Sequence, residues 1–142
     1  SHLNEQSFWD VLPLAKHIIA SHSNARVLCD HPRNLTDDQA LALVKKGGHI
    51  HLVYYPLFIK KEVDSVTLED FMKHFVHFAD LVGVQYLGLG SDFDGIEQWV
   101  KDLRHVGQYG NIIDALCKNY SESQVEAFLY GNWRNFMLAN LL

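Results

Sequence analysis

Hydrophobic positions along the chain alternate between the spacing of helices and the spacing of strands. Apolar residues at intervals of three or four indicate helices, and short runs rich in β-branched and aromatic residues indicate strands. The pattern predicts helices at 4–16, 36–47, 67–82, 112–118 and from 121 onward, and strands at 17–21, 49–55 and 85–91. Because helices and strands alternate in this order, a parallel sheet with covering helices is favoured.

Local signals define several of the helix ends. Thr36 and Gln39 form a capping box, in which the two side chains satisfy free amides at a helix start. Gly47 and Gly48 form a natural stop for that helix. A second capping box, Ser121 to Gln124, opens the final helix.

The helix that follows Thr67 has the clearest periodicity in the chain. Its apolar residues recur at intervals of three and four and define one buried face: Leu68, Phe71, Met72, Phe75, Ala79 and Val82. His74 and His77 are expected opposite this stripe, on a solvated face.

The chain length limits the possible architectures. With 142 residues it corresponds to a single domain, 1–142. Three parallel strands, or four if the chain begins at the end of one, cannot close a barrel, because a (β/α)8 barrel needs roughly 250 residues. The predicted class is therefore α/β, either as a small open domain or as the C-terminal half of a (β/α)8 TIM barrel.

Composition and charge exclude several classes of function. A hydrophobic content of 48% excludes intrinsic disorder, and 12 basic against 17 acidic residues give a net charge of −5 without a basic cluster. Nucleic acid is therefore not an expected partner. The two cysteines do not form a CxxC pair, and no apolar run reaches the roughly 18–20 residues of a membrane span. We expect no membrane segment in this chain and a cytoplasmic location.

The histidines differ in their predicted position along the strands. In parallel α/β folds the reactive residues lie at the carboxyl ends of strands, and the amino ends mainly serve stability. His22 lies where the first full strand ends, and His2 has an identical Ser-His context ahead of the first helix. His49 and His51 lie near the start of their strand and are expected at the stable end.

Two further residues are candidates for chemistry. Asp92 directly follows the third strand, where a carboxylate can take a proton from a metal-activated water or hold a substrate amine. It can equally be a turn residue that bonds its own backbone, as aspartates near glycine often do. Arg33 precedes a helix and can offer its planar fork to a carboxylate, or it can be a surface arginine.

Three segments around these residues closely resemble the membrane (renal-type) dipeptidases, and the resemblance extends from residue 1 to about residue 138. The segments are SHSNAR at 21–26, CDHPRNLTD at 29–37 and GLGSDFDG at 88–95. Members of that family are zinc metallopeptidases with an amidohydrolase-like (β/α)8 barrel, in which a bridging carboxylate and a bridging water or hydroxide join two zinc ions. The resemblance implies a dipeptide as the substrate.

The resemblance also implies roles for individual residues. His2 and His22 are similar to the two histidines that bind one zinc, although a Ser-His pair at the start of a chain can also be a cloning remnant. Arg33 is similar to the residue that pairs with the terminal carboxylate of the substrate. Asp92 is similar to the acidic residue that handles the proton or the free amine. Tyr55, at a strand end, is expected to line the substrate pocket or to serve packing.

The chain departs from the family pattern in two ways. Val53-Tyr54-Tyr55 stands where the family commonly has Asn-Phe-Tyr. The His-x-Asp zinc motif and the bridging glutamate belong to the first half of the barrel and have no counterpart here. We therefore expect part of a dipeptidase site, an isolated chain with little or no activity, and pairing of the chain as a homodimer or with the missing N-terminal half. The alternative is a non-catalytic α/β module with a binding or assembly role.

Overall fold

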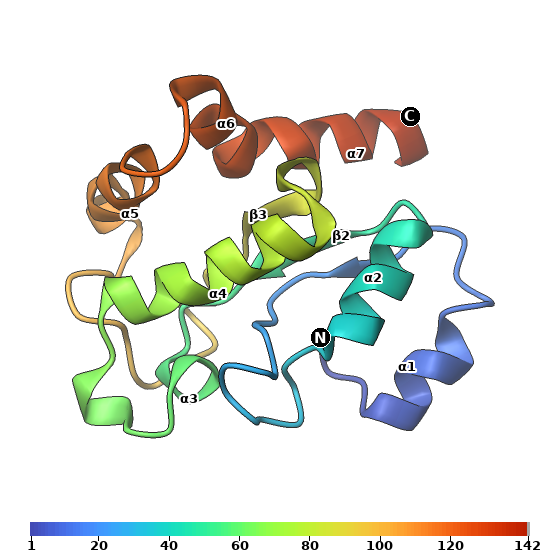
Figure 1. Ribbon diagram of the computed structural model, residues 1–142, viewed down its shortest axis with the longest axis horizontal. Coiled ribbons are helices and arrows are strands. Elements are labelled where there is room, and N and C mark those ends of the chain that lie inside the picture. The colour runs from blue at the N-terminus through green and yellow to red at the C-terminus, as the bar shows by residue number, and fades with distance from the viewer. Residues whose placement is uncertain (142) are drawn as a thin grey trace.

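The computed structural model describes residues 1–141, and its helices and strands alternate along most of the chain (Figure 1). The α-helices and strands are α1 Glu5–Val11, β1 Ile19–Ala20, α2 Asp37–Lys45, β2 His49–Leu52, α3 Pro56–Ile59, α4 Leu68–Val82, β3 Leu87–Leu89, α5 Tyr109–Cys117, α6 Glu122–Glu126 and α7 Asn132–Leu141. Short 3-10 helices at Val63–Ser65, Val84–Tyr86 and Val106–Gln108 and a π-helix at Ala127–Gly131 complete the set.

The three strands form one parallel sheet in the order β1-β2-β3, which confirms the predicted α/β class. Ile19 pairs with His49, and His51 pairs with Gly88. Figure 1 shows α4 crossing in front of the sheet, with α2 beside α4. The helix α7 lies on the other side of β2 and β3 from α4. Because all three strands point the same way, their carboxyl ends meet at one edge, where residues from distant parts of the sequence can combine.

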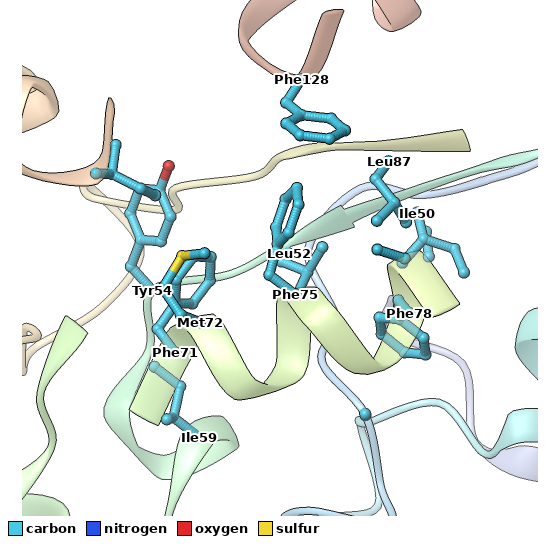
Figure 2. Packing of buried hydrophobic residues seen from close by; sticks show 14 of the residues in the cluster. Ile50, Leu52, Tyr54, Ile59, Phe71, Met72, Phe75, Phe78, Leu87 and Phe128 are labelled. Carbon is cyan, nitrogen blue, oxygen red and sulfur yellow. The ribbon is translucent and has the colours of Figure 1, made fainter. Parts of the chain in front are cut away.

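The core lies between the sheet and α4. The stripe predicted for this helix is confirmed at Phe71, Met72, Phe75 and Ala79, which are buried, and Phe78, which was not predicted to belong to it, is buried as well. These side chains pack with Ile50 and other sheet residues (Figure 2). The ring of Phe128, from the π-helix that precedes α7, lies over Phe75 with centroids 4.8 Å apart. Burying each of these aromatic side chains contributes about 1.5–3 kcal/mol, so they hold α4 against the sheet and the π-helix.

Element boundaries are shorter than the sequence predicts. The strands predicted at 17–21, 49–55 and 85–91 are reduced to two, four and three residues, because a ladder extends only as far as its neighbour runs alongside. The first helix ends at Val11 rather than near residue 16, since Pro13 lacks the amide that a further turn needs. A short helix that the sequence did not predict follows the second strand: Pro56 opens α3 at the first helical position.

The prediction that His74 lies on a solvated face is wrong. Its side chain is buried, Nδ1 accepts a hydrogen bond from the amide of Ala25 at 3.1 Å, and Nε2 donates to the carbonyl oxygen of Ile59 at 2.9 Å. His74 lies three residues after Phe71 and four before Phe78, so it shares the buried side of α4 with these two residues. His77 is partly exposed and bonds Asp37 of α2 at 2.8 Å.

None of the helices within the described residues is long and apolar enough to cross a bilayer.

The side of β2 that faces away from α4 carries two buried histidines. The ring of His51 meets Trp133 edge-on at 5.1 Å, and the ring of His49 lies 5.0 Å from Phe136, so both rings pack under α7. His49 Nδ1 and His51 Nε2 have no hydrogen-bond partner within the described residues. Burial therefore lowers the pKa of both groups, that of His51 to about 4.

The burial of His51 predicts that the protein loses stability as the pH falls. The pKa of His51 is lower in the folded chain than in the unfolded chain. Below about pH 6.5 the unfolded state therefore binds a proton that the folded state does not bind. The contribution of His51 is complete above pH 7 and is lost progressively down to about pH 4, amounting to about 3 kcal/mol. Urea unfolding at pH 7.5 and 4.5 measures it, with His51→Met as the comparison. An equal loss in the variant would contradict this origin.

Candidate functional site

Two Ser-His pairs lie side by side at the carboxyl end of β1. The backbone amide of His22 donates to Ser1 Oγ at 2.9 Å, which ties the segment before α1 to the residues that follow β1. The two imidazole rings, His2 and His22, meet with centroids 4.9 Å apart and Nε2 atoms 3.0 Å apart. Residues 20 positions apart in the sequence therefore bring two ring nitrogens to one point.

Arg33 approaches the same point from the loop between β1 and α2. Its Nη2 lies 3.0 Å from Nε2 of His2 and 2.9 Å from Nε2 of His22. Its Nε donates to the backbone oxygen of Ser1 at 3.2 Å, and its guanidinium carbon lies 5.0 Å from the centroid of the Phe58 ring. Arg33 is thus held by four groups from three separate segments.

The protonation of the two imidazoles follows from these contacts. A guanidinium group can only donate, so each Nε2 must accept, and the ring proton of each histidine belongs on Nδ1. In His22 the Nδ1 proton has an acceptor, Ser21 Oγ, at 2.8 Å. Burial lowers the pKa of His22, with Arg33 and His2 adding to the effect and Asp92 opposing it. His22 is therefore neutral near pH 7 with its Nε2 lone pair directed at Arg33.

Two buried asparagines set the conformation of the loop that carries Arg33. Asn34 donates from Nδ2 to the backbone oxygens of Cys29 and Phe58, at 2.9 and 2.8 Å, and accepts the amide of Asn24 on Oδ1. Asn24 in turn exchanges two hydrogen bonds with the backbone of Val53, just beyond β2. The sequence analysis did not single out Asn24 or Asn34. The signal that could have indicated them is the amide side chain within each of the segments 21–26 and 29–37.

Asp92 and His22 line the same hollow. The hollow, of about 360 Å³, lies at the carboxyl ends of the strands, and His51 and Trp133 are also among its lining residues. The expectation that His51 lies at the stable end of its strand is therefore wrong: β2 has only four residues, and His51 is the third of them.

Asp92 adopts a left-handed backbone conformation with φ 58°, unusual for a residue with a side chain. Gly95 leaves room for its carboxylate, since a Cβ there would come within 2.4 Å of a carboxylate oxygen of Asp92. Asp94 is exposed instead.

Tyr55 lies apart from the other candidate residues. It precedes α3 as its N-terminal cap residue, and its ring meets that of Phe58 at 5.0 Å. Phe58 is the ring that supports Arg33, so Tyr55 reaches the guanidinium group only through an intervening aromatic side chain. It is not among the residues that line the hollow beside Asp92.

The converging imidazoles suit two ligands of one zinc ion. Two nitrogen ligands at 2.0–2.1 Å from a tetrahedral zinc lie about 3.3 Å apart, close to the 3.0 Å between the Nε2 atoms of His2 and His22. The hydrogen bond from His22 to Ser21 Oγ is the type of outer contact that orients a histidine ligand. Within residues 1–141 no group of three or more His, Cys, Asp or Glu side chains is arranged to hold a metal.

Comparison with known proteins identifies the class to which this fold and site belong. The family model of the membrane dipeptidases, peptidase family M19, matches residues 1–138. The chain therefore belongs to the membrane dipeptidase family.

Individual relatives agree with this assignment. An uncharacterized dipeptidase of Schizosaccharomyces pombe is 35% identical over 133 residues, which are 91% of this chain and 32% of the relative. The dipeptidase tcpJ of Claviceps purpurea is 33% identical over 131 residues, covering 91% of this chain and 31% of that protein. A metallo peptidase from Rhodobacter sphaeroides, solved with a phosphinate mimic of the dipeptide L-Ala-D-Ala, superposes with a TM-score of 0.92 and 28% identity.

The match covers almost the whole chain but only part of each relative. The superposition includes 99% of this chain and 41% of the Rhodobacter sphaeroides structure. The chain thus spans about a third of the length of these two curated relatives and about two fifths of the solved one.

Replacement of Asn34 tests the role of the buried amides. Asn34→Ala leaves two backbone oxygens and one amide without their partner, and we expect a loss of at least about 3 kcal/mol in the free energy of unfolding. Urea unfolding measures the loss, with Asn119→Ala at an exposed position as the control. Equal stabilities of the two variants would show that the amide network does not hold the loop.

Proposed function

We propose that this chain forms the C-terminal half of a (β/α)8 barrel in a zinc-dependent dipeptidase and carries about half of its active site. The proposal rests on the convergence of His2, His22 and Arg33 at one point, next to a hollow that Asp92 lines. Family membership and the dipeptidase relatives support hydrolysis of a dipeptide by the whole protein.

Each residue has a distinct task in this proposal. His2 and His22 hold the metal through Nε2, the atom that each ring directs to their common point. When bound, zinc supplies Lewis-acid activation of the scissile carbonyl and of a water molecule. Arg33 pairs with the terminal carboxylate of the dipeptide through its planar fork. Asp92 accepts the proton released by the attacking water or holds the free amine of the substrate.

The position of the two oppositely charged residues supports an orientation for the dipeptide. Arg33 contacts both imidazoles, and Asp92 lines the hollow that His22 also lines. A dipeptide has a negative carboxylate at one end and a positive amine at the other, so its peptide bond would lie between these residues, next to the histidines. Tyr55 has a supporting part, since it packs against the ring beneath Arg33.

The catalytic carboxylate is tested in the protein of the full reading frame. Asp92→Asn keeps the shape of the side chain but cannot accept a proton, and we expect hydrolysis of dipeptides to fall by about 10²–10⁴-fold, as for loss of a general base. Asp94→Asn is the matched control, because Asp94 lies two residues away and is exposed. Loss of activity in neither variant would remove Asp92 from the mechanism. A full-length protein without dipeptidase activity, pure and folded, would favour a binding or assembly role instead.

The edges of the sheet predict association of the isolated chain. Within residues 1–141, β1 pairs on one side only, while at β3 the side chain of Asn132 donates to the backbone oxygen of Leu87 at 2.8 Å. An unpaired strand edge is a template for another strand. We therefore expect the 16.3 kDa chain to sediment as a dimer or larger species. A monodisperse monomer would contradict the expected pairing and leave the catalytic proposal intact.

A further inference from the structure

The guanidinium group of Arg33 and a metal ion need the same two electron pairs. A neutral imidazole with its proton on Nδ1 has a single lone pair on Nε2, directed outward in the plane of the ring. Arg33 Nη2 carries two hydrogens and lies 3.0 and 2.9 Å from the Nε2 atoms of His2 and His22, one hydrogen for each ring. Both lone pairs are therefore used by Arg33 in this arrangement.

The two modes of binding exclude each other. A lone pair that accepts a hydrogen bond cannot coordinate a metal at the same time, and a positive guanidinium group at 3 Å also repels a divalent cation. His2 and His22 can hold zinc only when Arg33 has moved away from both ring nitrogens.

We propose that Arg33 couples substrate binding to metal binding: its guanidinium group competes with zinc for Nε2 of His2 and His22 until a carboxylate draws it away. The inference deepens the proposed function and rests on it, because it uses the same histidines and the same arginine. It assigns Arg33 a second effect, on metal affinity, in addition to recognition of the substrate.

A carboxylate is a suitable group to move Arg33. A carboxylate adds its own negative charge to the pair and often accepts two parallel hydrogen bonds from the planar guanidinium group, whereas a neutral imidazole accepts a single one. The other contacts of the side chain, Nε with the oxygen of Ser1 and the guanidinium carbon over the Phe58 ring, do not involve the histidines. They can guide the group as its outer nitrogen turns toward a new partner.

The coupling is reciprocal. If a carboxylate raises the affinity for zinc by some factor, zinc raises the affinity for the carboxylate by the same factor. Couplings between sites in proteins typically amount to about 5- to 150-fold in affinity, and we expect a value in this range.

Zinc affinity, measured by competition with a chromophoric chelator, tests the proposal without any need for activity. We expect Arg33→Met to bind zinc about 5- to 150-fold more tightly than Arg104→Met. Methionine retains an apolar stem against Phe58 but offers no donor, and Arg104 is an exposed arginine whose replacement changes the net charge equally. His22→Ala shows that the zinc is bound at this site.

All of these zinc measurements use the protein of the full reading frame, which supplies the remaining ligands. The unsubstituted protein provides a second measurement that does not depend on the folding of any variant. N-acetylglycine, which has a carboxylate, is expected to tighten zinc binding, whereas N-acetylglycinamide, which lacks the charge, is not. Arg33→Met is expected to respond to neither compound.

The outcomes separate this inference from the proposed function. Zinc that is lost in His22→Ala, but bound equally by Arg33→Met and Arg104→Met and unaffected by N-acetylglycine, would overturn the competition and leave the dipeptidase assignment standing. Zinc whose affinity is the same in the unsubstituted full-length protein, in Arg33→Met and in His22→Ala would overturn the competition together with the assignment of His22 as a ligand. Zinc bound only once Arg33 is replaced would be the strongest support.

Discussion

The attachment of the loop between β1 and α2 to the sheet is the constraint on which the candidate site depends. This loop carries Arg33, and two fully buried asparagines, Asn24 and Asn34, fix it by bonds to the backbone of distant segments. Burying an amide is costly unless its hydrogen bonds are made, so such a network has one satisfied arrangement and few acceptable alternatives. The position of the guanidinium group is therefore set by groups that take no part in chemistry themselves.

A buried polar side chain with satisfied hydrogen bonds also joins the loop to α4. His74 would be out of place in an apolar stripe if its ring nitrogens were unpaired, but they join the amide of Ala25 to the carbonyl of Ile59. One residue of the core helix thus ties the start of the loop to the end of α3, which carries the ring beneath Arg33. The packing of α4 on the sheet and the geometry around His2 and His22 therefore depend on each other through His74.

Sequence periodicity was sufficient for the fold class and for the sheet edge at which the candidate residues meet. It placed His22 and Asp92 at strand ends because that rule depends only on the direction of the strands. It failed for His74 and for the two asparagines, since they depend on partners that are 15 to 49 residues away in the sequence. A hydrophobic pattern records which face of an element is buried and contains no information about which polar groups meet there.

Charge explains why the candidate site combines neutral histidines with an arginine. Burial favours the uncharged form of His22, which keeps its lone pair available at neutral pH, while Arg33 is too basic to lose its proton. The two requirements conflict if metal and arginine use the same nitrogen atoms at once, and they are compatible if a substrate carboxylate holds the arginine elsewhere. A site built in this way would favour the metal when a substrate is present, so that recognition of the substrate and assembly of the reactive centre would become one equilibrium.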